Sequence, residues 1–316
     1  MNLTFDVDLV YLWCDGSDPE FQRKKLEAFE KTNKSLLNKD GLVNARFVNS
    51  DELKYSLRSA EKYAPWIRNI YIVTYEQVPA WLNTKHPKIK IIDHKDIIPQ
   101  KYLPTFNSNV IEIFLPMIPD LSEHFLYAND DMFFWGDVDK DFFFNENGAP
   151  ICRVIRRKAK NVHSIYSITI NNAYNLVSER FPDKDIKYWP HHGIDSYRRS
   201  DFLECLNCFK EEIMETASHT FRDTSDVQRM IVNFYAIAAK GATVKEVARR
   251  KWYQKFLPFT EENAYTSCRI SKMKQFRGKD FKLFCINDGN KTKDKDRKYM
   301  QEMLEEKFPQ KSAYEL

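Results

Sequence analysis

The sequence lacks any apolar run close to the roughly 20 residues that a membrane-spanning helix needs. Residues 1–10 also lack the unbroken apolar stretch of a secretion signal, because Asp6 and Asp8 interrupt them. We therefore expect a soluble, cytoplasmic protein. Basic segments at residues 153–160 and 249–251 are typical of solvated faces, but such segments also attract polyanions and acidic lipid. They leave room for a peripheral contact with the inner face of the membrane.

Cysteines are few and scattered, with six in 316 residues. Only Cys205 and Cys208 are closely spaced, and there is no second close pair that would complete a zinc site. The sequence therefore predicts neither a disulfide framework nor structural zinc.

A strong excess of one charge is also missing. Lys and Arg total 49 and Asp and Glu total 45, which gives a net charge of +4 with both signs spread along the chain. Nucleic acid is therefore not an expected partner. Aromatic residues make up 14% and hydrophobic residues 43%, a composition that excludes a disordered chain.

The first half alternates short β-branched or aromatic runs with helical spacing. This alternation predicts an α/β fold with a mostly parallel, Rossmann-like sheet and flanking helices. One helix is especially well marked, because Asn49 can cap it and Glu52 stands three positions later, as in a capping box. The expected strands are residues 7–14, 69–74, 89–93 and 125–128, and the expected helices are residues 19–37, a segment from 49 to before Pro65, and residues 109–117.

The second half is predicted to be mainly helical. No Pro/Gly/Ser-rich linker, internal repeat or low-complexity segment separates it from the first half, so we expect one integrated catalytic unit. The expected elements are strands at residues 151–155 and 281–286 and helices at 165–180, 198–215, 226–240 and 295–308.

Polar and acidic residues follow the predicted strands. Ligands of open parallel sheets bind outside the carboxyl ends of the strands, so these residues are candidates for a site. Carboxylates that share one edge repel one another, and a hard divalent cation such as Mg²⁺ or Mn²⁺, bound to phosphate, would offset that cost. The alternative is a set of solvated turns. The candidates are Asp15, Gly16, Ser17 and Asp18; Thr74; Asp93 and His94; Asn129, Asp130 and Asp131; and Asn287 and Asp288.

Two further segments carry residues suited to chemistry. His191 and His192 follow Pro190 in a segment that suits a loop facing a site, although adjacent histidines can also be simply exposed. Arg222 stands just before a predicted helix, where a guanidinium can clamp a phosphate. The alternative for Arg222 is a surface ion pair with Asp223 or Asp226.

A series of motifs resembles the Stealth family of sugar-phosphate transferases. The first family region resembles residues 8–19, with Cys14 where Val is usual. The fourth region resembles residues 284–288 and 308–315, with Gly289 where a third polar residue is common. Neither departure removes a proposed ligand. The second region resembles residues 51–59, 63–74, 77–83, 103–109 and 125–132, and the third resembles residues 190–191 and 219–226.

The resemblance implies transfer of a sugar 1-phosphate from a nucleotide sugar to an acceptor saccharide hydroxyl, in capsule or surface polysaccharide synthesis. The donor would be UDP-linked, such as UDP-GlcNAc, and UMP would leave. The resemblance assigns residues 1–150 to a nucleotide-sugar-binding core and 151–316 to the half that completes the active site. It places the essential His on His191, the Arg on Arg222, and the acidic residues on Asp130 or Asp131 and on Asp288. On that basis we expect His191 to be the base, Arg222 to neutralise charge on the transferred phosphoryl group, and Asp130, Asp131 and Asp288 to hold the metal. It implies a donor pocket lined by Asp15, Gly16, Ser17, Asp18, Asn49, Glu52 and Asn107.

Two other functions fit part of the same pattern. A metal-dependent glycosyltransferase uses the same donor but releases UDP, because it cleaves the bond between sugar and phosphate. A non-catalytic carbohydrate-binding protein would use the many aromatic side chains as stacking platforms. The nucleotide released from the donor distinguishes the three functions.

Overall fold

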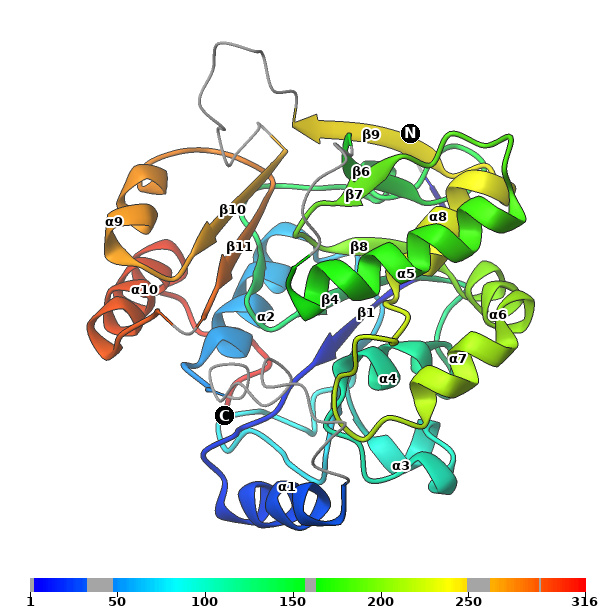
Figure 1. The fold of residues 1–316 in the computed structure, drawn as a ribbon. Helices are drawn as coiled ribbons and strands as arrows, with labels where there is room; N and C mark the ends of the chain where they lie inside the picture. The colour runs from blue at the N-terminus through cyan, green and yellow to red at the C-terminus, as the bar shows by residue number, and fades with distance from the viewer. Residues whose placement is uncertain (1–2, 33–47, 157–162, 249–261, 290) are drawn as a thin grey trace.

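A five-stranded sheet runs through the centre of the computed structural model, which describes residues 3–32, 48–156, 163–248, 262–289 and 291–316 (Figure 1). Its strand order is β3-β2-β1-β4-β8. The first four strands are parallel, and β8 runs antiparallel to β4. This confirms the predicted α/β class and the mostly parallel, Rossmann-like sheet. The strands are β1 (Val7–Leu12), β2 (Ile70–Thr74), β3 (Ile89–Asp93), β4 (His124–Asn129) and β8 (Asp195–Arg198).

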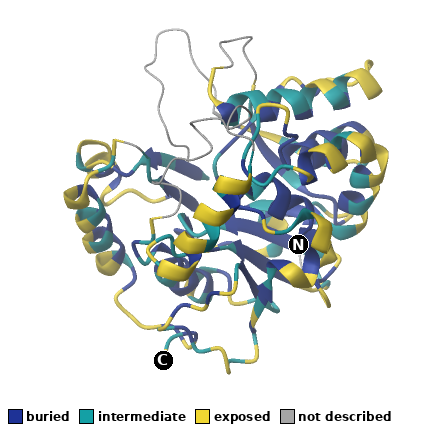
Figure 2. Cartoon of the chain, turned by 60° about the horizontal axis from the view of Figure 1, so that its bottom comes forward, coloured by how far each residue is buried: buried dark blue, intermediate teal, exposed yellow. Residues whose placement is uncertain are grey.

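Helices cover both faces of this sheet, because its strands carry apolar side chains on both sides. In β1, Val10 packs into one hydrophobic cluster while Leu9 and Tyr11 pack into the other. Continuous apolar runs are typical of such doubly covered parallel strands. Figure 2 shows the buried sheet enclosed by helices whose outer faces are exposed. The helices are α1 (Pro19–Lys31), α2 (Glu52–Tyr63), α3 (His94–Ile97), α4 (Ser108–Ile113), α5 (Ile165–Arg180), α6 (Arg199–Cys208), α7 (Lys210–Ala217), α8 (Met230–Ala239), α9 (Ile270–Met273) and α10 (Asp294–Lys307).

The start of α2 differs from the prediction. Asn49 does not cap the helix; Asp51 occupies the N-cap position with a left-handed φ of 64°. The Asn49 side chain instead accepts a hydrogen bond from the Asp51 amide at 3.1 Å, in the segment that precedes the helix. The Glu52 carboxylate accepts from the Ser50 amide at 2.6 Å, which ties this side chain to the helix start. The helix lies where it was expected, but the prediction of Asn49 as its N-cap was wrong.

Two small sheets accompany the central one, and the first of them joins the two halves of the chain. One has the order β10-β11-β5, built from Asn263–Ser267, Leu283–Asn287 and Met132–Phe134. The other has the order β7-β6-β9, built from Tyr188–Pro190, Ile151–Arg156 and Thr243–Ala248. Strands β5, β7, β8, β9 and β10 were not predicted, and the expected helix at 198–215 divides into α6 and α7. The second half remains richer in helix than in strand.

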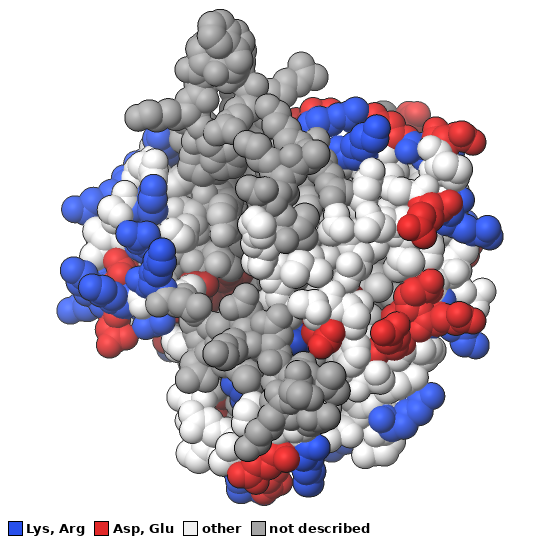
Figure 3. Space-filling model, in the orientation of Figure 1, with Lys and Arg blue, Asp and Glu red and all other residues white. Residues whose placement is uncertain are grey.

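The surface carries both charge signs. Figure 3 shows Lys and Arg side chains gathered over α9 and α10, with acidic and basic side chains mixed on the opposite side of this face. All six cysteines lie in the described part of the chain and are free. Within that same part, no helix combines the length and apolar character needed to cross a membrane.

Candidate active site

A cavity of about 610 Å³ opens where β1 and β4 end. Leu12 and Asn129, the last residues of those strands, lie in its wall, at the point where β2 and β4 flank β1 on opposite sides. Ligands bind at this position in open α/β sheets. The structure brings six of the predicted site residues together here. They are Glu52, Asp130, Asp131, His191, Arg222 and Asp288.

Asp130 and Asp131 occupy the tight connection between β4 and β5. Strand β5 pairs with β11, so that Met132 lies opposite Cys285. The main-chain oxygen of Asp131 accepts from the Ile286 amide at 3.0 Å, and the Asn287 side chain donates to its carboxylate at 3.4 Å. The pairing of β5 with β11 therefore places the two acids beside the segment that carries Asp288.

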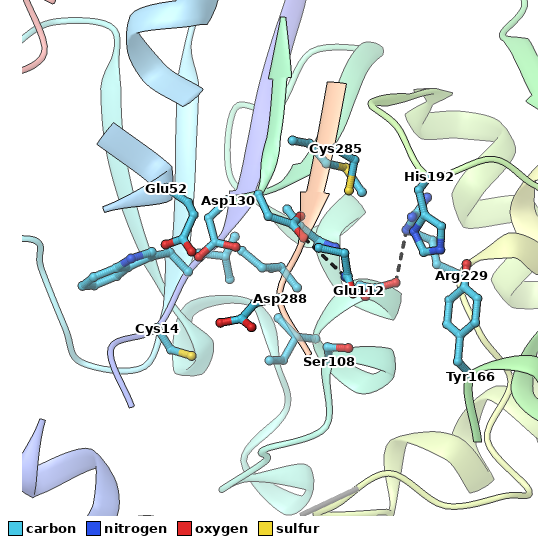
Figure 4. Close-up of a pocket in the computed structure, with 18 of the residues that line it drawn as sticks. Cys14, Glu52, Ser108, Glu112, Asp130, Tyr166, His192, Arg229, Cys285 and Asp288 are labelled. Carbon is cyan, nitrogen blue, oxygen red and sulfur yellow. Dashed lines mark hydrogen bonds and ion pairs between the residues drawn. The ribbon is translucent and has the colours of Figure 1, made fainter. Parts of the chain in front are cut away.

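Glu52 joins these acids from the start of α2. Figure 4 shows the Glu52 and Asp130 side chains converging on one side of the cavity, with Asp288 next to them. Helix α2 is held against β5, because the Ser59 hydroxyl accepts from the Phe134 amide at 3.0 Å. The packing of α2 on β5 thus holds the carboxylate of Glu52 close to those of Asp130 and Asp131.

Burial is the main reason that these carboxylates resist ionisation. Desolvation, followed by repulsion from Glu52, raises the pKa of Asp131 to about 7. Burial likewise raises the pKa of Asp130, with repulsion from Asp131 second, and burial followed by repulsion from Asp130 raises that of Glu52. Each carboxylate therefore makes ionisation of its neighbours more costly.

Asp288 differs from the other acids because it forms an ion pair with the guanidinium of Arg297. Its carboxylate accepts from Arg297 Nε at 2.8 Å and from the Gly289 amide at 2.6 Å. Arg297 belongs to α10, and no sequence pattern indicated that this helix contacts the site. Any ligand of Asp288 must share this carboxylate with Arg297.

The acidic residues fit a hard divalent cation by their chemistry. One carboxylate oxygen of Asp131, Oδ1, is buried and forms no hydrogen bond. Across the ranges described, no group of three or more His, Cys, Asp or Glu side chains is placed to hold a metal ion. Mg²⁺ is commonly held by one or two carboxylates together with substrate phosphates. Asp130 and Asp131 are suited to such a site, and their role as ligands stays a prediction.

His191 follows directly after β7 and is 9% exposed. Its Nδ1 lies 3.1 Å from the main-chain oxygen of His192. Burial lowers the pKa of His191 to about 4, so the imidazole is neutral at cellular pH. His192 stacks between Tyr166 and Tyr265, with ring centroids 5.3 and 4.5 Å away. Figure 4 shows His192 and Tyr166 across the cavity from the acids.

Arg222 projects from a loop that a buried carboxylate holds in place. Its guanidinium contacts the Ser108 hydroxyl, and among the described residues it forms no ion pair, so the expected pair with Asp223 or Asp226 is not seen there. Asp226 is instead fully buried. Its carboxylate accepts from Asn107, from Asn109, from the Asp223 amide and from His219, at 2.8, 3.0, 3.1 and 2.8 Å.

The other predicted donor-pocket residues do not line the cavity. Asn107 is buried and bonded to Asp226, and Asn49 is part of the turn before α2. Asp18 caps α1 by accepting from the Glu20 amide, and Asp15 accepts from the Ser17 amide and hydroxyl. Gln22 donates to the carbonyl of Gly16. The turn formed by Asp15, Gly16, Ser17 and Asp18 is thus occupied by its own hydrogen bonds, and contact with a donor stays a prediction.

Sequence reasoning missed a buried charge network in the cavity wall. Arg229 pairs with Glu112 at 3.1 Å and Asp195 at 2.9 Å, and its guanidinium lies 4.2 Å from the centroid of the Tyr127 ring. Arg229 lies next to α8, Glu112 in α4 and Asp195 in β8. No local pattern indicates a pairing of residues so far apart in sequence.

Comparisons with known proteins show which sequences this chain resembles. The family models described as Stealth protein CR1, conserved region 1, and Stealth protein CR2, conserved region 2, match residues 5–30 and 46–153. The chain is 31% identical over 348 aligned residues to the exopolysaccharide phosphotransferase cps2G of Lactiplantibacillus plantarum, covering 98% of this chain and 96% of that protein. It is 34% identical over 301 residues to the capsular polysaccharide phosphotransferase fcs1 of Haemophilus influenzae, covering 91% and 79%.

Some relatives are considerably longer. The exopolysaccharide phosphotransferase CpsY of Mycobacterium tuberculosis is 33% identical over 300 residues, which cover 92% of this chain and 53% of that protein. The chain thus spans about half the length of this mycobacterial relative.

The raised pKa of Asp130 predicts a stability cost that an uncharged isostere removes. Between about pH 4 and 7 the folded protein keeps a proton that the unfolded chain has lost, so stability falls as pH rises through this range. Without added divalent metal, Asp130→Asn should be more stable than the parent by about 1–3 kcal/mol at pH 8, and the two should converge near pH 4. Thermal unfolding across pH measures the difference.

Asp137→Asn serves as the control, since Asp137 is an exposed acid near the same region. It should leave the melting temperature unchanged at both pH values. A less stable Asp130→Asn protein at pH 8 would contradict the argument from burial and repulsion.

Asp226 predicts a link between stability and the Arg222 loop. Asp226→Ala removes the acceptor for Asn107 and Asn109 and should cost about 2–4 kcal/mol in chemical denaturation. Asp223→Ala is the matched control in the same loop, because within the described part of the chain that carboxylate accepts from Ser225 alone, which is exposed. An equal cost for both variants would show that Asp226 is not the organising residue.

Proposed function

This chain belongs to the Stealth family, and on that premise we propose that it transfers a sugar 1-phosphate from a nucleotide sugar to a hydroxyl of an acceptor saccharide. The donor is a UDP-linked hexose or N-acetylhexosamine, UMP is released, and the product belongs to capsule or surface polysaccharide. The relatives named as capsular or exopolysaccharide phosphotransferases support the reaction class. The enzyme works at the cytoplasmic side, beside the polysaccharide-assembly machinery.

One observation carries this proposal. A single cavity collects a cluster of carboxylates, a neutral imidazole and a guanidinium from five distant segments of the chain. Phosphoryl transfer depends mainly on positioning and on stabilising negative charge, so it needs this mixture of groups. A site that only bound carbohydrate would have no need of three carboxylates held close together at a cost in stability.

In the proposed reaction, the acceptor oxygen attacks the phosphorus that carries the sugar. A bond forms between that oxygen and the phosphorus, and the bond from the phosphorus to the bridging oxygen of the diphosphate breaks. UMP leaves with the electron pair of the broken bond. The acceptor hydroxyl loses its proton to His191, which burial keeps neutral and able to accept it.

Arg222 supports the same step through its positive charge. Its guanidinium reaches the cavity and has no carboxylate partner among the described residues, so its charge is available to an anionic substrate. Fixed cations directed at oxygens that gain charge stabilise the transition state. The Asp226 network keeps the Arg222 loop in place, so that little reorganisation accompanies the reaction.

One or two of Asp130, Asp131 and Asp288, together with phosphates of the donor, would hold the Mg²⁺ or Mn²⁺ ion. When bound, such an ion supplies positive charge that neutralises the diphosphate and relieves the repulsion among the carboxylates. Within the protein, the chain's own contribution is to hold Asp130 and Asp131 in the turn between β4 and β5 and to fix Asp288 through Arg297.

A screen of nucleotide sugars with Mg²⁺ or Mn²⁺ tests the reaction directly. With a donor labelled at its β-phosphate, the proposed transfer releases UMP and leaves the label in the saccharide product. Release of UDP, with the label in the nucleotide, would establish the glycosyltransferase instead. Binding of the saccharide with neither nucleotide product would establish the carbohydrate-binding protein.

His191→Ala tests the proposed base. Loss of a general base lowers kcat by about 10²–10⁴-fold, whereas the donor should still bind with similar affinity, because its phosphates are held by other groups. Single-turnover rates and calorimetric binding of the donor separate these effects. His163→Ala is the control, because His163 is exposed and outside the cavity lining. Full activity of His191→Ala would remove the imidazole from the reaction.

A further inference from the structure

The surface of α9 and α10 carries the protein's excess of positive charge. Residues 269–298 contain eleven Lys or Arg and four Asp or Glu, a net charge of +7, whereas the whole chain has a net charge of +4. The rest of the chain is therefore slightly acidic. Figure 3 shows Lys and Arg side chains gathered over the two helices.

Three of the four acids in this segment are already engaged. Asp288 and Asp294 both pair with Arg297, at 2.8 and 3.0 Å, and Asp296 is buried. Six exposed lysines, in contrast, form no ion pair with another residue in the described part of the chain. We call these six the basic surface; they are Lys272, Lys274, Lys291, Lys293, Lys295 and Lys298.

The basic surface is continuous, although its lysines come from two segments. The Asp296 carboxylate accepts hydrogen bonds from the Ile270 amide at 2.9 Å and from the Lys293 amide at 3.0 Å. One buried side chain thus joins the start of α9 to the start of α10. The lysines of the two segments therefore lie on adjoining parts of the surface.

Helix stability does not account for the lysines at the start of α10. Lys293 is the N-cap residue of this helix, and Lys295 lies in its first turn. The helix dipole places partial positive charge at an N-terminus, where acidic side chains are favoured and lysines are disfavoured. A bound anion would offset the cost of collecting cations there.

The basic surface begins at the edge of the cavity. Asp288 and Gly289 line the cavity, and Figure 4 shows Asp288 beside the other acids. The Gly289 amide donates to the Thr292 hydroxyl at 3.1 Å, and the Thr292 amide donates to the Gly289 carbonyl at 2.8 Å. This turn leads directly into α10. A chain whose end reacts in the cavity can therefore continue over the basic surface.

We propose that the basic surface binds an acceptor that is itself a phosphodiester-linked saccharide chain, which runs from the cavity over the start of α10 toward α9. The proposal rests on the function proposed above, because each transfer adds one phosphodiester, and hence one negative charge, to the acceptor. An acceptor that has been extended several times is thus a polyanion. Lysine carries a compact charge on a flexible stem, which suits phosphates spaced along such a chain. A neutral saccharide would instead need aromatic rings to stack on.

Binding of poly(glycerol phosphate), a phosphodiester polymer without sugar, tests the surface without turnover. At about 0.1 M salt the protein should bind this polymer and should not bind neutral dextran. Binding should be lost near 1 M salt, where the screening length falls to about 3 Å. The four-lysine variant should bind the polymer about 10–100-fold more weakly. It combines Lys272→Gln, Lys274→Gln, Lys295→Gln and Lys298→Gln.

A second variant with the same change in net charge is the matched control. Its four lysines are exposed and lie in other parts of the fold, so it should bind poly(glycerol phosphate) as the parent does. It combines Lys85→Gln, Lys90→Gln, Lys184→Gln and Lys210→Gln. Melting curves of both variants establish that they are folded.

An acidic membrane is the other polyanion that a basic surface can attract. Vesicles of phosphatidylglycerol and phosphatidylcholine therefore form a separate arm of the experiment. Vesicle binding that the four-lysine variant loses, without binding of poly(glycerol phosphate) by the parent, would overturn the proposal and assign the surface to a membrane.

Kinetics give the second readout. With product chains separated by length as acceptors, the four-lysine variant should have a KM about 10–100-fold higher for chains with many phosphodiesters. Its kcat should be unchanged, as should its KM for the donor and for an acceptor without a phosphodiester.

The outcomes separate this inference from the proposed function. Unaltered polymer binding in the four-lysine variant, or equal changes of KM for acceptors with and without phosphodiesters, would overturn the role of the basic surface and leave the transfer reaction standing. A parent protein that transfers sugar phosphate to no acceptor would overturn the proposed function itself.

Discussion

The cost of ionising clustered carboxylates with little access to water is the constraint on which the site depends. Glu52, Asp130 and Asp131 come from two elements that pack tightly together, and burial raises the pKa of all three. Left alone, this cluster would push α2 away from the turn between β4 and β5. The apolar packing of α2 and the hydrogen bond from the Phe134 amide to Ser59 oppose that push. The fold thus holds a charge cluster that only a cation or a proton can relieve.

Polar side chains outside the cavity hold the reactive segments in place. Asp226 gathers four donors beneath the loop of Arg222, Asn263 anchors the loop of His191, and Arg297 fixes Asp288. Asn263 and Arg297 come from elements other than those that carry the residues they hold, whereas Asp226 lies in the Arg222 loop itself and ties it to Asn107 and Asn109 beside and in α4. The three loops are therefore set by tertiary contacts, and the strands provide only their starting points.

The sequence predicted what is encoded locally. Strands β1 to β4 and helix α5 were found near their true bounds, because continuous apolar runs and helical spacing mark them. Asp130 and Asp131 were found because they follow a strand that ends at the sheet edge. Strands β5, β7 and β10 were missed, since each is short or polar and is defined by its partner strand. The pair Arg229–Glu112 was missed for the same reason, because its members are 117 residues apart. The pair Arg297–Asp288 spans only nine residues, but it forms across the turn between β11 and α10, which no local pattern indicated.

Asn107 shows why a family motif does not by itself identify the residues that bind substrate. It lies within the region that the second family model matches and was expected in the donor pocket, yet its buried amide donates a hydrogen bond to Asp226. Its effect on the cavity passes through the Arg222 loop. Loss of activity in an Asn107 variant would therefore be consistent with a displaced Arg222 and would not show contact with the donor. The same reasoning applies to Asp18, whose carboxylate caps α1 and accepts from Gln77. In this chain, motif residues that do not line the cavity stabilise the loops and helices beside it, and a substrate contact has to be established by binding data for each residue separately.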